Sequence, residues 1–412
     1  MAETSDWEKV RLSEVITIKH GWPFKTEFIS EELTGRPIVV NIGNFRYTGG
    51  FRFDTTRVRE YRGDYPPDYE LQPGDILVVM TCQTSEGEIL GVPARVPDDG
   101  RVYLHNQRLG KVVVTRPDKV LSDFLYWLFL WREFNRWLFT SSSGTKILHT
   151  APDRIGSFEM DLPSVNEQHG IASILSALDN KVELNERLNM ILEEIAKALF
   201  KRWFIDFEFP NEEGKPYKSS GGDMVYNKEL GKELPKGWSV VALHDVCEFA
   251  YGEPLREDSR RIGSIPVYGS NGQVGWHDKP LVKGPGIVVG RKGNPGVLTW
   301  AQSDFFPIDT TFYVVPKGQT NDLHYLFHAF SRLNLPSLAS DSAVPGLNRN
   351  IAYTTPLFMP PAELLGRFEE FMSALTSKVY RNNRESSALA LIRELVLPRL
   401  MSGKIRVPVE VR

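Results

Sequence analysis

The sequence predicts an α+β protein made of two diverged copies of one unit, each a globular α/β part with a curved sheet followed by a long helix. Three observations carry this prediction. A nine-residue pattern that begins at Trp7 returns 231 positions later at Trp238. Pro163 is matched by Pro360 after 197 positions, and behind each proline apolar residues recur every seven positions. Because this repeat is far longer than the roughly 20–50 residues of a solenoid, it indicates duplicated domains.

Length and composition agree with two or three ordinary globular domains. The chain has 412 residues, of which 41% are hydrophobic and 25% charged. Its start is acidic and polar, unlike a signal peptide, and its most apolar run, Leu125–Trp131, is too short to span a bilayer. Cys82 and Cys247 lack metal-ligand spacing, so we expect buried or bystander thiols in a reducing compartment. These features predict a cytoplasmic protein without a membrane segment.

The strands of each copy are predicted from short apolar runs that glycine and proline interrupt. In the first copy these runs are Pro37–Ile42, Asp75–Met80 and Lys111–Val114, and a helical pattern follows over Asp123–Phe139. The second copy repeats the plan with Gly286–Val289, Thr311–Val315 and a helix around Asp322–Leu333. Leu148 and Leu347, which are 199 positions apart, extend the match. We therefore expect two mixed α/β parts with the same order of elements.

Two long helices are predicted behind the globular parts. Gln168–Phe204 contains no proline, and a second helix is expected over Ala362–Leu397, where Pro398 would end it. In each helix an apolar residue recurs every seven positions, and one position of this heptad series is an asparagine. It is Asn185 in the first helix and Asn382 in the second. This pattern is typical of a two-helix coiled coil in which the asparagine fixes the register. The two helices would most simply pair antiparallel, with the globular parts at opposite ends. Two separate surface helices remain the alternative.

These elements give a domain plan. Residues 1–163 form the first globular part and 164–206 its helix; residues 236–360 form the second globular part, and 361–412 the second helix with a C-terminal tail. Between them, residues 207–235 are rich in Gly, Lys, Glu and Ser, with Ser219–Gly222 near the middle. Such a composition favours an exposed linker.

The usual catalytic motifs are absent from the sequence. There is no Gly-x-x-x-x-Gly-Lys-Ser/Thr loop, no histidine pair with metal spacing and no Gly-x-Ser-x-Gly turn. Glycines at 269, 272 and 275, and again at 290, 293 and 296, have a spacing that differs from the dinucleotide-binding fingerprint. We interpret them as tight turns between strands, with ligand contact as the alternative. No catalytic group or cofactor is expected on this chain.

Two loops at equivalent places differ in chemistry. Met80–Ser85 follows one predicted strand, and Gly290–Asn294 follows its counterpart. Arg and Lys suit guanine edges, Asn and Gln suit adenine, and basic glycine-rich turns hold phosphates. The net charge of −3 gives no overall basic excess, so DNA binding would need a local concentration of basic residues. Loops also diverge when nothing constrains them, and this alternative stays open.

The candidate DNA contacts are chosen from these loops and from the turns that precede each long helix. In the first copy they are Gln83, Arg108 and Lys146. In the second copy they are Asn271, Arg291, Lys292 and Arg349. Lys146 and Arg349 are expected in equivalent loops, and no metal ligands are expected in either copy.

The plan resembles the specificity subunit of Type I restriction-modification systems over essentially the whole chain. The strongest local similarities are four short segments in the family's order: Trp203–Phe207, Leu234–Trp238, Ile265–Gly272 and Leu400–Ile405. None of them is a catalytic signature. Type IIB specificity subunits share this architecture.

The resemblance implies a non-catalytic subunit that binds double-stranded DNA. Two target recognition domains would each read one half of a bipartite site, while the paired helices set the spacing and dock two modification subunits. Those partners would carry S-adenosylmethionine and methylate adenine, and restriction subunits with a translocase could join them. The alternative from another class is a two-headed coiled-coil adaptor that binds proteins. Arg256, Arg260 and Arg261, close to the second set of candidates, speak mildly against the adaptor.

Overall fold

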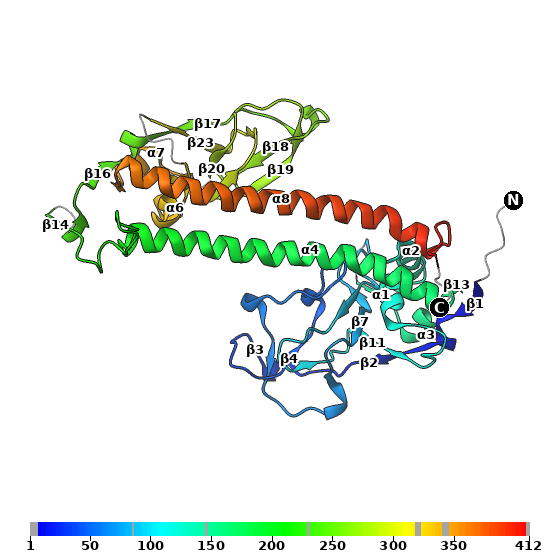
Figure 1. Ribbon diagram of the computed structural model, residues 1–412. Helices are drawn as coiled ribbons and strands as arrows, with labels where there is room; N and C mark the ends of the chain where they lie inside the picture. The colour runs from blue at the N-terminus through cyan, green and yellow to red at the C-terminus, as the bar shows by residue number, and fades with distance from the viewer. Residues whose placement is uncertain are drawn as a thin grey trace. The chain divides into compact units, whose positions relative to one another are not determined.

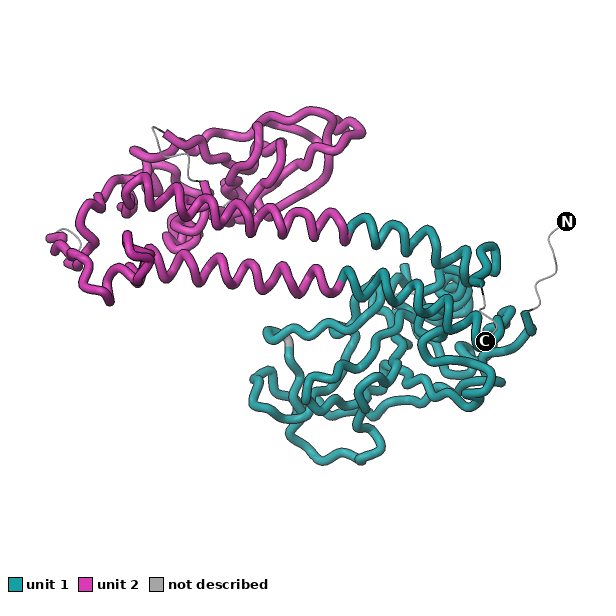
Figure 2. Tube along the Cα trace, in the orientation of Figure 1, with its two compact units in different colours: residues 1–182, 387–412 teal, residues 183–386 magenta. Residues whose placement is uncertain are grey.

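The protein is described here by a computed structural model, which Figure 1 shows as a ribbon. The structure describes residues 7–84, 86–144, 147–228, 231–317, 323–339 and 346–408. It divides into two compact units, residues 1–182 with 387–412, and residues 183–386 (Figure 2). Each unit holds one globular part and a portion of both long helices. The predicted α+β class with an internal duplication is confirmed.

The first globular part is built on two sheets and two strand pairs. One sheet has the order β2 (Ile16–His20), β11 (Leu109–Val114), β7 (Ile76–Val79), β9 (Pro93–Arg95). The other has the order β3 (Ile29–Ser30), β5 (Glu60–Tyr61), β4 (Ile38–Val39), β10 (Tyr103–Leu104), β6 (Glu70–Leu71). The pairs are β1 (Glu8–Arg11) with β13 (Glu159–Leu162), and β8 (Thr81–Cys82) with β12 (Leu148–His149). The helices are α1 (Ser122–Leu130), α2 (Arg132–Thr140) and α3 (Pro152–Gly156).

The second globular part repeats this arrangement. One sheet has the order β17 (Cys247–Tyr251), β23 (Thr311–Pro316), β20 (Gly286–Gly290), β21 (Leu298–Ala301). The other has the order β19 (Gly272–His277), β18 (Ile265–Gly269), β22 (Phe306–Pro307). One strand pair is β16 (Ser239–Ala242) with β24 (Pro356–Met359); a further pair, β14 (Met224–Asn227) with β15 (Lys232–Pro235), precedes this part within residues 207–235. The short helices are α5 (Leu243–Val246), α6 (Leu323–Arg332) and α7 (Arg349–Tyr353).

The two copies share strand order and close backbone approaches. In each, a four-stranded antiparallel sheet is accompanied by a second sheet that contains one parallel pair, β4 with β10 or β18 with β22. A close backbone approach at a glycine also repeats in both copies. A Cβ on Gly21 would lie 2.1 Å from the carbonyl oxygen of Asn106. A Cβ on Gly252 would lie 2.2 Å from the carbonyl oxygen of Ile308. A side chain at either glycine would therefore push two strands apart.

One predicted equivalence is wrong. Leu148 pairs with Cys82, whereas the Leu347 amide donates to the carbonyl oxygen of Arg291. In the first copy this bond is made by the Thr150 amide to Met80. Leu347 is thus the counterpart of Thr150, because the loop before it has changed in length between the copies.

The strands that are easiest to predict from the sequence are those buried completely in the core. Every residue of β7 and of β20 is buried, so both read as continuous apolar runs rather than alternating ones. The predicted helix over Asp123–Phe139 is two helices, since Trp131 adopts an extended conformation (φ −71°, ψ 124°) between α1 and α2. Six residues of α1 are buried on all sides, and such a segment has no periodicity to reveal a break.

The long helices are α4 (Val165–Phe200), which continues as a π-helical turn over Lys201–Ile205, and α8 (Ala362–Met401). Within the first unit Asp179 of α4 forms an ion pair with Arg393 of α8. Within the second unit Asn185 donates to the carbonyl oxygen of Asn382. Rising residue numbers on α4 therefore meet falling numbers on α8, which confirms the antiparallel pairing.

The expectation that Pro398 ends the second helix is wrong. Pro398 lies in the last turn of α8, where the missing N–H removes only one helical hydrogen bond. Leu400 and Met401 beyond it are buried, and their burial favours one more turn. The helix ends at Met401, and Gly403, two residues later, has the left-handed conformation of a C-terminal cap with φ of +69°.

The segment expected as an exposed linker contains ordered structure. The β14–β15 hairpin occupies part of it, and Phe209 stacks on Tyr217 with ring centroids 4.5 Å apart. Phe207 is buried, with its ring 5.3 Å from that of Trp238. These contacts tie the segment to the start of the second copy. Both cysteines are buried free thiols, as expected. None of the helices in the described ranges is long and apolar enough to cross a membrane.

Candidate nucleic-acid interface

The four candidates of the second copy gather at the carboxyl end of β20: Asn271, Arg291, Lys292 and Arg349. Asn271 lies in the turn of the β18–β19 hairpin, which contacts the loop after β20, since a Cβ on Gly290 would lie 2.9 Å from the Ser270 carbonyl oxygen. Arg349 begins α7, and the Leu347 amide just before it donates to the Arg291 carbonyl oxygen over 2.9 Å. The structure thus brings all four to one edge of the sheet.

Two of these candidates share one aromatic ring. The Cζ atoms of Arg291 and Arg349 each lie 4.9 Å from the ring centroid of Tyr251, the last residue of β17. Tyr251 is 51% exposed, whereas both arginines are half-buried. Tyr251 was missed by sequence reasoning, because it is separated from Arg291 and Arg349 by 40 and 98 positions and no local motif marks it.

The candidates of the first copy occupy the matching edge. Gln83 follows β8 and is exposed, and Arg108 is exposed immediately before β11. The Met80 amide donates to the Arg108 carbonyl oxygen over 3.0 Å, so the end of β7 and the start of β11 meet at Arg108. Lys146 lies outside the described residues. Arg349 is the counterpart of Pro152 at the start of α3, and not of Lys146.

An aromatic cluster next to Arg108 was also missed. Trp22 is 36% exposed, its ring centroid lies 5.2 Å from that of Tyr69, and its backbone pairs with Asn106. Beneath it, burial lowers the pKa of His105 to about 4. The ring is therefore neutral near pH 7, and Nε2 donates to the Leu109 carbonyl oxygen over 2.9 Å. We interpret His105 as a support for the strands and Trp22 as part of the exposed surface.

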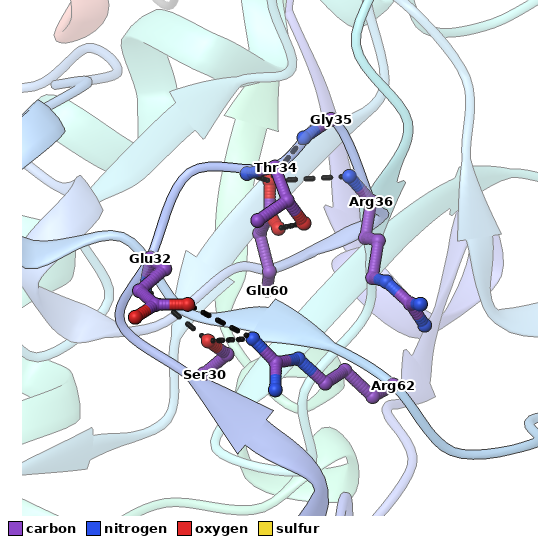
Figure 3. A network of polar contacts seen from close by, with 7 residues as sticks. All are labelled: Ser30, Glu32, Thr34, Gly35, Arg36, Glu60 and Arg62. Carbon is purple, nitrogen blue, oxygen red and sulfur yellow. Dashed lines mark hydrogen bonds and ion pairs between the residues drawn. The ribbon is translucent and has the colours of Figure 1, made fainter.

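A buried carboxylate holds a loop of the first copy (Figure 3). Glu60 has 0% exposure and accepts hydrogen bonds from the amides of Thr34, Gly35 and Arg36 and from the Thr34 hydroxyl. Burial opposes ionisation of Glu60, but these hydrogen bonds outweigh it and lower the pKa of the carboxyl group. The exposed Arg36 side chain is thereby presented from a fixed loop.

The two helix asparagines lie in one polar layer. Asn185 and Asn382 are buried, with exposures of 0% and 1%. Asn185 Nδ2 donates to Glu385 over 2.9 Å and to Ser386 over 3.3 Å, and Asn382 Nδ2 donates to Asn189 over 2.8 Å. Asn189 and Ser386 are themselves 197 positions apart, so the layer follows the internal repeat.

The described residues expose a binding surface at the two sheet edges. Within these ranges no group of three or more His, Cys, Asp or Glu side chains could hold a metal ion. Burial raises the pKa of Cys247 to about 12, so this thiol is not a nucleophile near neutral pH. What the two sheet edges present is basic, amide and aromatic side chains, the groups that contact phosphates and base edges.

Comparisons with known proteins agree with this surface. Residues 4–197 match the family model described as a Type I restriction modification DNA specificity domain. The specificity subunit of the Type I restriction enzyme MjaIX of Methanocaldococcus jannaschii is 29% identical over 95% of this chain and 98% of its own length. That of the enzyme HindI of Haemophilus influenzae is 23% identical over 78% of this chain and 87% of its own.

The fold has a relative among solved structures. The crystal structure of a Type I restriction-modification S subunit from M. genitalium superposes with a TM-score of 0.64, covering 97% of this chain and 98% of that one at 18% identity. Specificity subunits are the DNA-recognition components of these systems and not the catalytic ones. Over nearly its whole length the chain is similar to the specificity subunits of Type I restriction-modification systems.

Proposed function

We propose that each globular part reads one half of a bipartite site in double-stranded DNA. The observation that carries this proposal is the pair of equivalent sheet edges, which share a backbone plan and differ in their side chains. Gln83 and Arg108 occupy one edge, while Arg291, Lys292 and Arg349 occupy the other. Recognition of two different half-sites requires different side chains at the two sheet edges, and a common backbone can present both sets.

The helix pair would set the distance between the half-sites. α4 has 36 residues, which at about 1.5 Å per residue corresponds to a rod of roughly 54 Å. Inserting one heptad into both α4 and α8, next to the layer of Asn185 and Asn382, keeps the apolar lanes in phase. The insertion lengthens each rod by roughly 10 Å, or about three base pairs. An active complex whose preferred spacer does not change would contradict this role.

The buried asparagines would fix how α4 and α8 align. A single polar layer penalises every slipped pairing, because a shift would place an amide against apolar side chains. Asn185 Nδ2 donates to the Asn382 carbonyl oxygen and Asn382 Nδ2 donates to Asn189 Oδ1, and a slipped pairing would lose both bonds. Replacing Asn185 and Asn382 together with leucine is expected to keep the helices paired while admitting other alignments. Cysteine cross-linking between the two helices would detect them.

The outward faces of the helices would dock the modification subunits. α4 exposes Met190 (60%), Ile191 (56%) and Ile195 (47%), and α8 exposes Leu391 (58%), Ile392 (45%) and Leu395 (57%). Ile195 and Ile392 are repeat counterparts, 197 positions apart, so the two patches suit two copies of one partner. Co-purification with the modification subunit should be lost in the double variant Ile191→Asp, Ile392→Asp. It should be kept in the control Glu193→Ala.

The partners would supply the chemistry in the cytoplasm: S-adenosylmethionine bound on the modification subunits, methylation of adenine, and cleavage where restriction subunits join. The test is single-molecule sequencing for N6-methyladenine in host cells with this gene intact and deleted. A split motif, two short blocks around a fixed spacer, should lose its methylation on deletion. Methylation that persists unchanged while the gene is expressed would instead favour the protein-binding adaptor.

A further inference from the structure

The second copy holds two arginines against one tyrosine ring. Arg291 comes from the end of β20 and Arg349 from the start of α7, and each places its Cζ 4.9 Å from the Tyr251 centroid. The two guanidinium carbons are therefore at most twice that distance apart. Each cation gains from the negative face of the ring, but the two cations repel one another. The arrangement concentrates positive charge beside an exposed side chain.

Backbone hydrogen bonds fix both guanidinium groups. Arg291 Nη1 donates to the Asp309 carbonyl oxygen over 2.9 Å, and Arg349 Nη1 donates to the Phe249 carbonyl oxygen over 3.2 Å. A guanidinium has five N–H donors, so most of the donors in each group are not used by these bonds. Both groups are thus oriented before any ligand arrives, which lowers the entropy cost of binding one.

No carboxylate neutralises this pair within the part of the chain that the structure describes. Neither Arg291 nor Arg349 has an acidic side chain within ion-pair distance there, whereas Arg261 of the same copy pairs with Asp278 over 3.1 Å. Two half-buried cations beside one another are unfavourable without an anion. An anionic ligand from outside the chain would neutralise the two positive charges.

We infer that Arg291, Tyr251 and Arg349 form a clamp for a backbone phosphate of the DNA, with Tyr251 as the residue that positions both arginines. The inference rests on the proposed function and names the ligand group at this edge of the second copy. A phosphodiester presents two anionic oxygens, which match N–H donors arriving from two guanidinium groups. Lys292 is exposed next to Arg291, and its flexible side chain adds a further positive charge that needs no fixed orientation toward the phosphate.

The first copy has no such clamp. Its residues at the equivalent positions are Met80 for Arg291, His20 for Tyr251 and Pro152 for Arg349, as the strand registers and helix starts show. None of these side chains carries a fixed positive charge. The clamp is therefore specific to the half-site that the second copy would read.

Binding to a duplex of arbitrary sequence tests the clamp, because a phosphate contact does not depend on the bases. The full chain, purified with its modification subunit, is titrated by fluorescence anisotropy at several salt concentrations. Tyr251→Leu should lower the slope of log K against log salt by about 1 and weaken binding by roughly fivefold. Tyr251→Phe keeps the ring and should restore both values.

The controls separate positioning from folding. Tyr226→Leu removes another exposed tyrosine of the same unit and should leave the salt slope unchanged. Arg291→Gln combined with Tyr251→Leu should cost less than the sum of the two single variants, because Tyr251 acts in part through Arg291. An unchanged slope in Tyr251→Leu would overturn the clamp, and so would a relaxed preference at one base position, which would indicate a base contact. Failure of the unaltered complex to bind any DNA would instead refute the proposed function.

Discussion

The two sheet edges of this molecule share a backbone and differ in charge. At the carboxyl end of β20 the second copy carries Arg291 and Lys292, with Arg349 close by, whereas the end of β7 in the first copy carries the neutral Met80. In the first copy the basic residue, Arg108, lies immediately before the neighbouring strand β11. The two copies share the backbone hydrogen-bond pattern at this edge, but their basic residues lie at different positions. The two half-sites should therefore depend differently on electrostatics.

The junctions at which each long helix meets a globular part show the same divergence. In the first unit Glu167 accepts from Trp7 Nε1 over 2.9 Å and from two nitrogens of Arg406 over 2.6 and 3.0 Å. In the second unit the counterpart of Trp7 is Trp238, which packs on the ring of Phe209. One junction is closed by a buried carboxylate, the other by aromatic rings.

The largest effect is expected where that carboxylate is removed. Glu167→Ala leaves a buried indole N–H and one side of Arg406 without an acceptor, and should cost about 3 kcal/mol of the stability of the first unit. Thermal unfolding followed by tryptophan fluorescence measures the loss. Glu133→Ala, an exposed acid of the same unit, is the matched control and should be neutral. Equal melting temperatures for both variants would refute the polar junction.

The next effect sharpens the comparison of the two edges. Replacing Arg291 and Lys292 together with alanine should weaken binding by about 2 kcal/mol, roughly thirtyfold, and only for the half-site of the second copy. Competition with duplexes that carry one intact and one scrambled half-site measures each half separately. Arg332→Ala, exposed on α6, serves as the control. An equal loss at both halves would show that these residues do not belong to one half-site.

A smaller effect concerns the loop that Glu60 holds. Glu60→Gln should speed hydrogen exchange of the segment 30–36 about tenfold at pH 7, because charge-assisted hydrogen bonds become neutral ones. Since the pKa of Glu60 is lowered in the fold, its stabilisation is complete above the ordinary value of 4.5 and is lost as pH falls through the folded value. The gap between the two proteins should therefore close in acid. Equal exchange at pH 7 would mean that Glu60 does not hold the loop.

The smallest effect is expected at the first edge. Arg108→Ala should weaken DNA binding by less than about 1 kcal/mol and lower the salt slope by no more than about 1, because the substitution removes a single cation from an exposed position. The same titration used for the second edge measures it. A loss as large as that of Arg291 and Lys292 would remove the asymmetry between the copies.

The sequence predicted the elements whose signals are local. The fully apolar runs of β7 and β20, the seven-residue lanes of α4 and α8, and the duplicated order of elements were all readable. The break at Trp131 was not, because the surrounding residues are buried on every side. The end of α8 was misplaced because one proline in a last turn costs a single hydrogen bond, which the burial of Leu400 and Met401 offsets.

The candidate site was readable in part for the same reason. Arg291 and Lys292 follow a recognisable strand, and the structure gathers the second copy's four candidates at one edge. Tyr251 and Glu60 were not predicted, because a tyrosine at a strand end and a single glutamate have no local sequence signature. Tyr251 contacts Arg349, 98 positions away, and Glu60 accepts hydrogen bonds from Thr34, 26 positions away. Such pairings depend on strand order, which one sequence does not specify.

The central claim is that each copy reads its own half-site, and a domain exchange tests it most directly. Residues 236–360 are replaced by the matching segment of the Methanocaldococcus jannaschii relative, and the chimaera is expressed with its modification subunit in a host without adenine methylation. Single-molecule sequencing then gives the methylated motif of the original and exchanged proteins. We expect one block of the motif to change while the other block and the spacer stay the same. A motif that changes in both blocks, or in neither, would contradict the account.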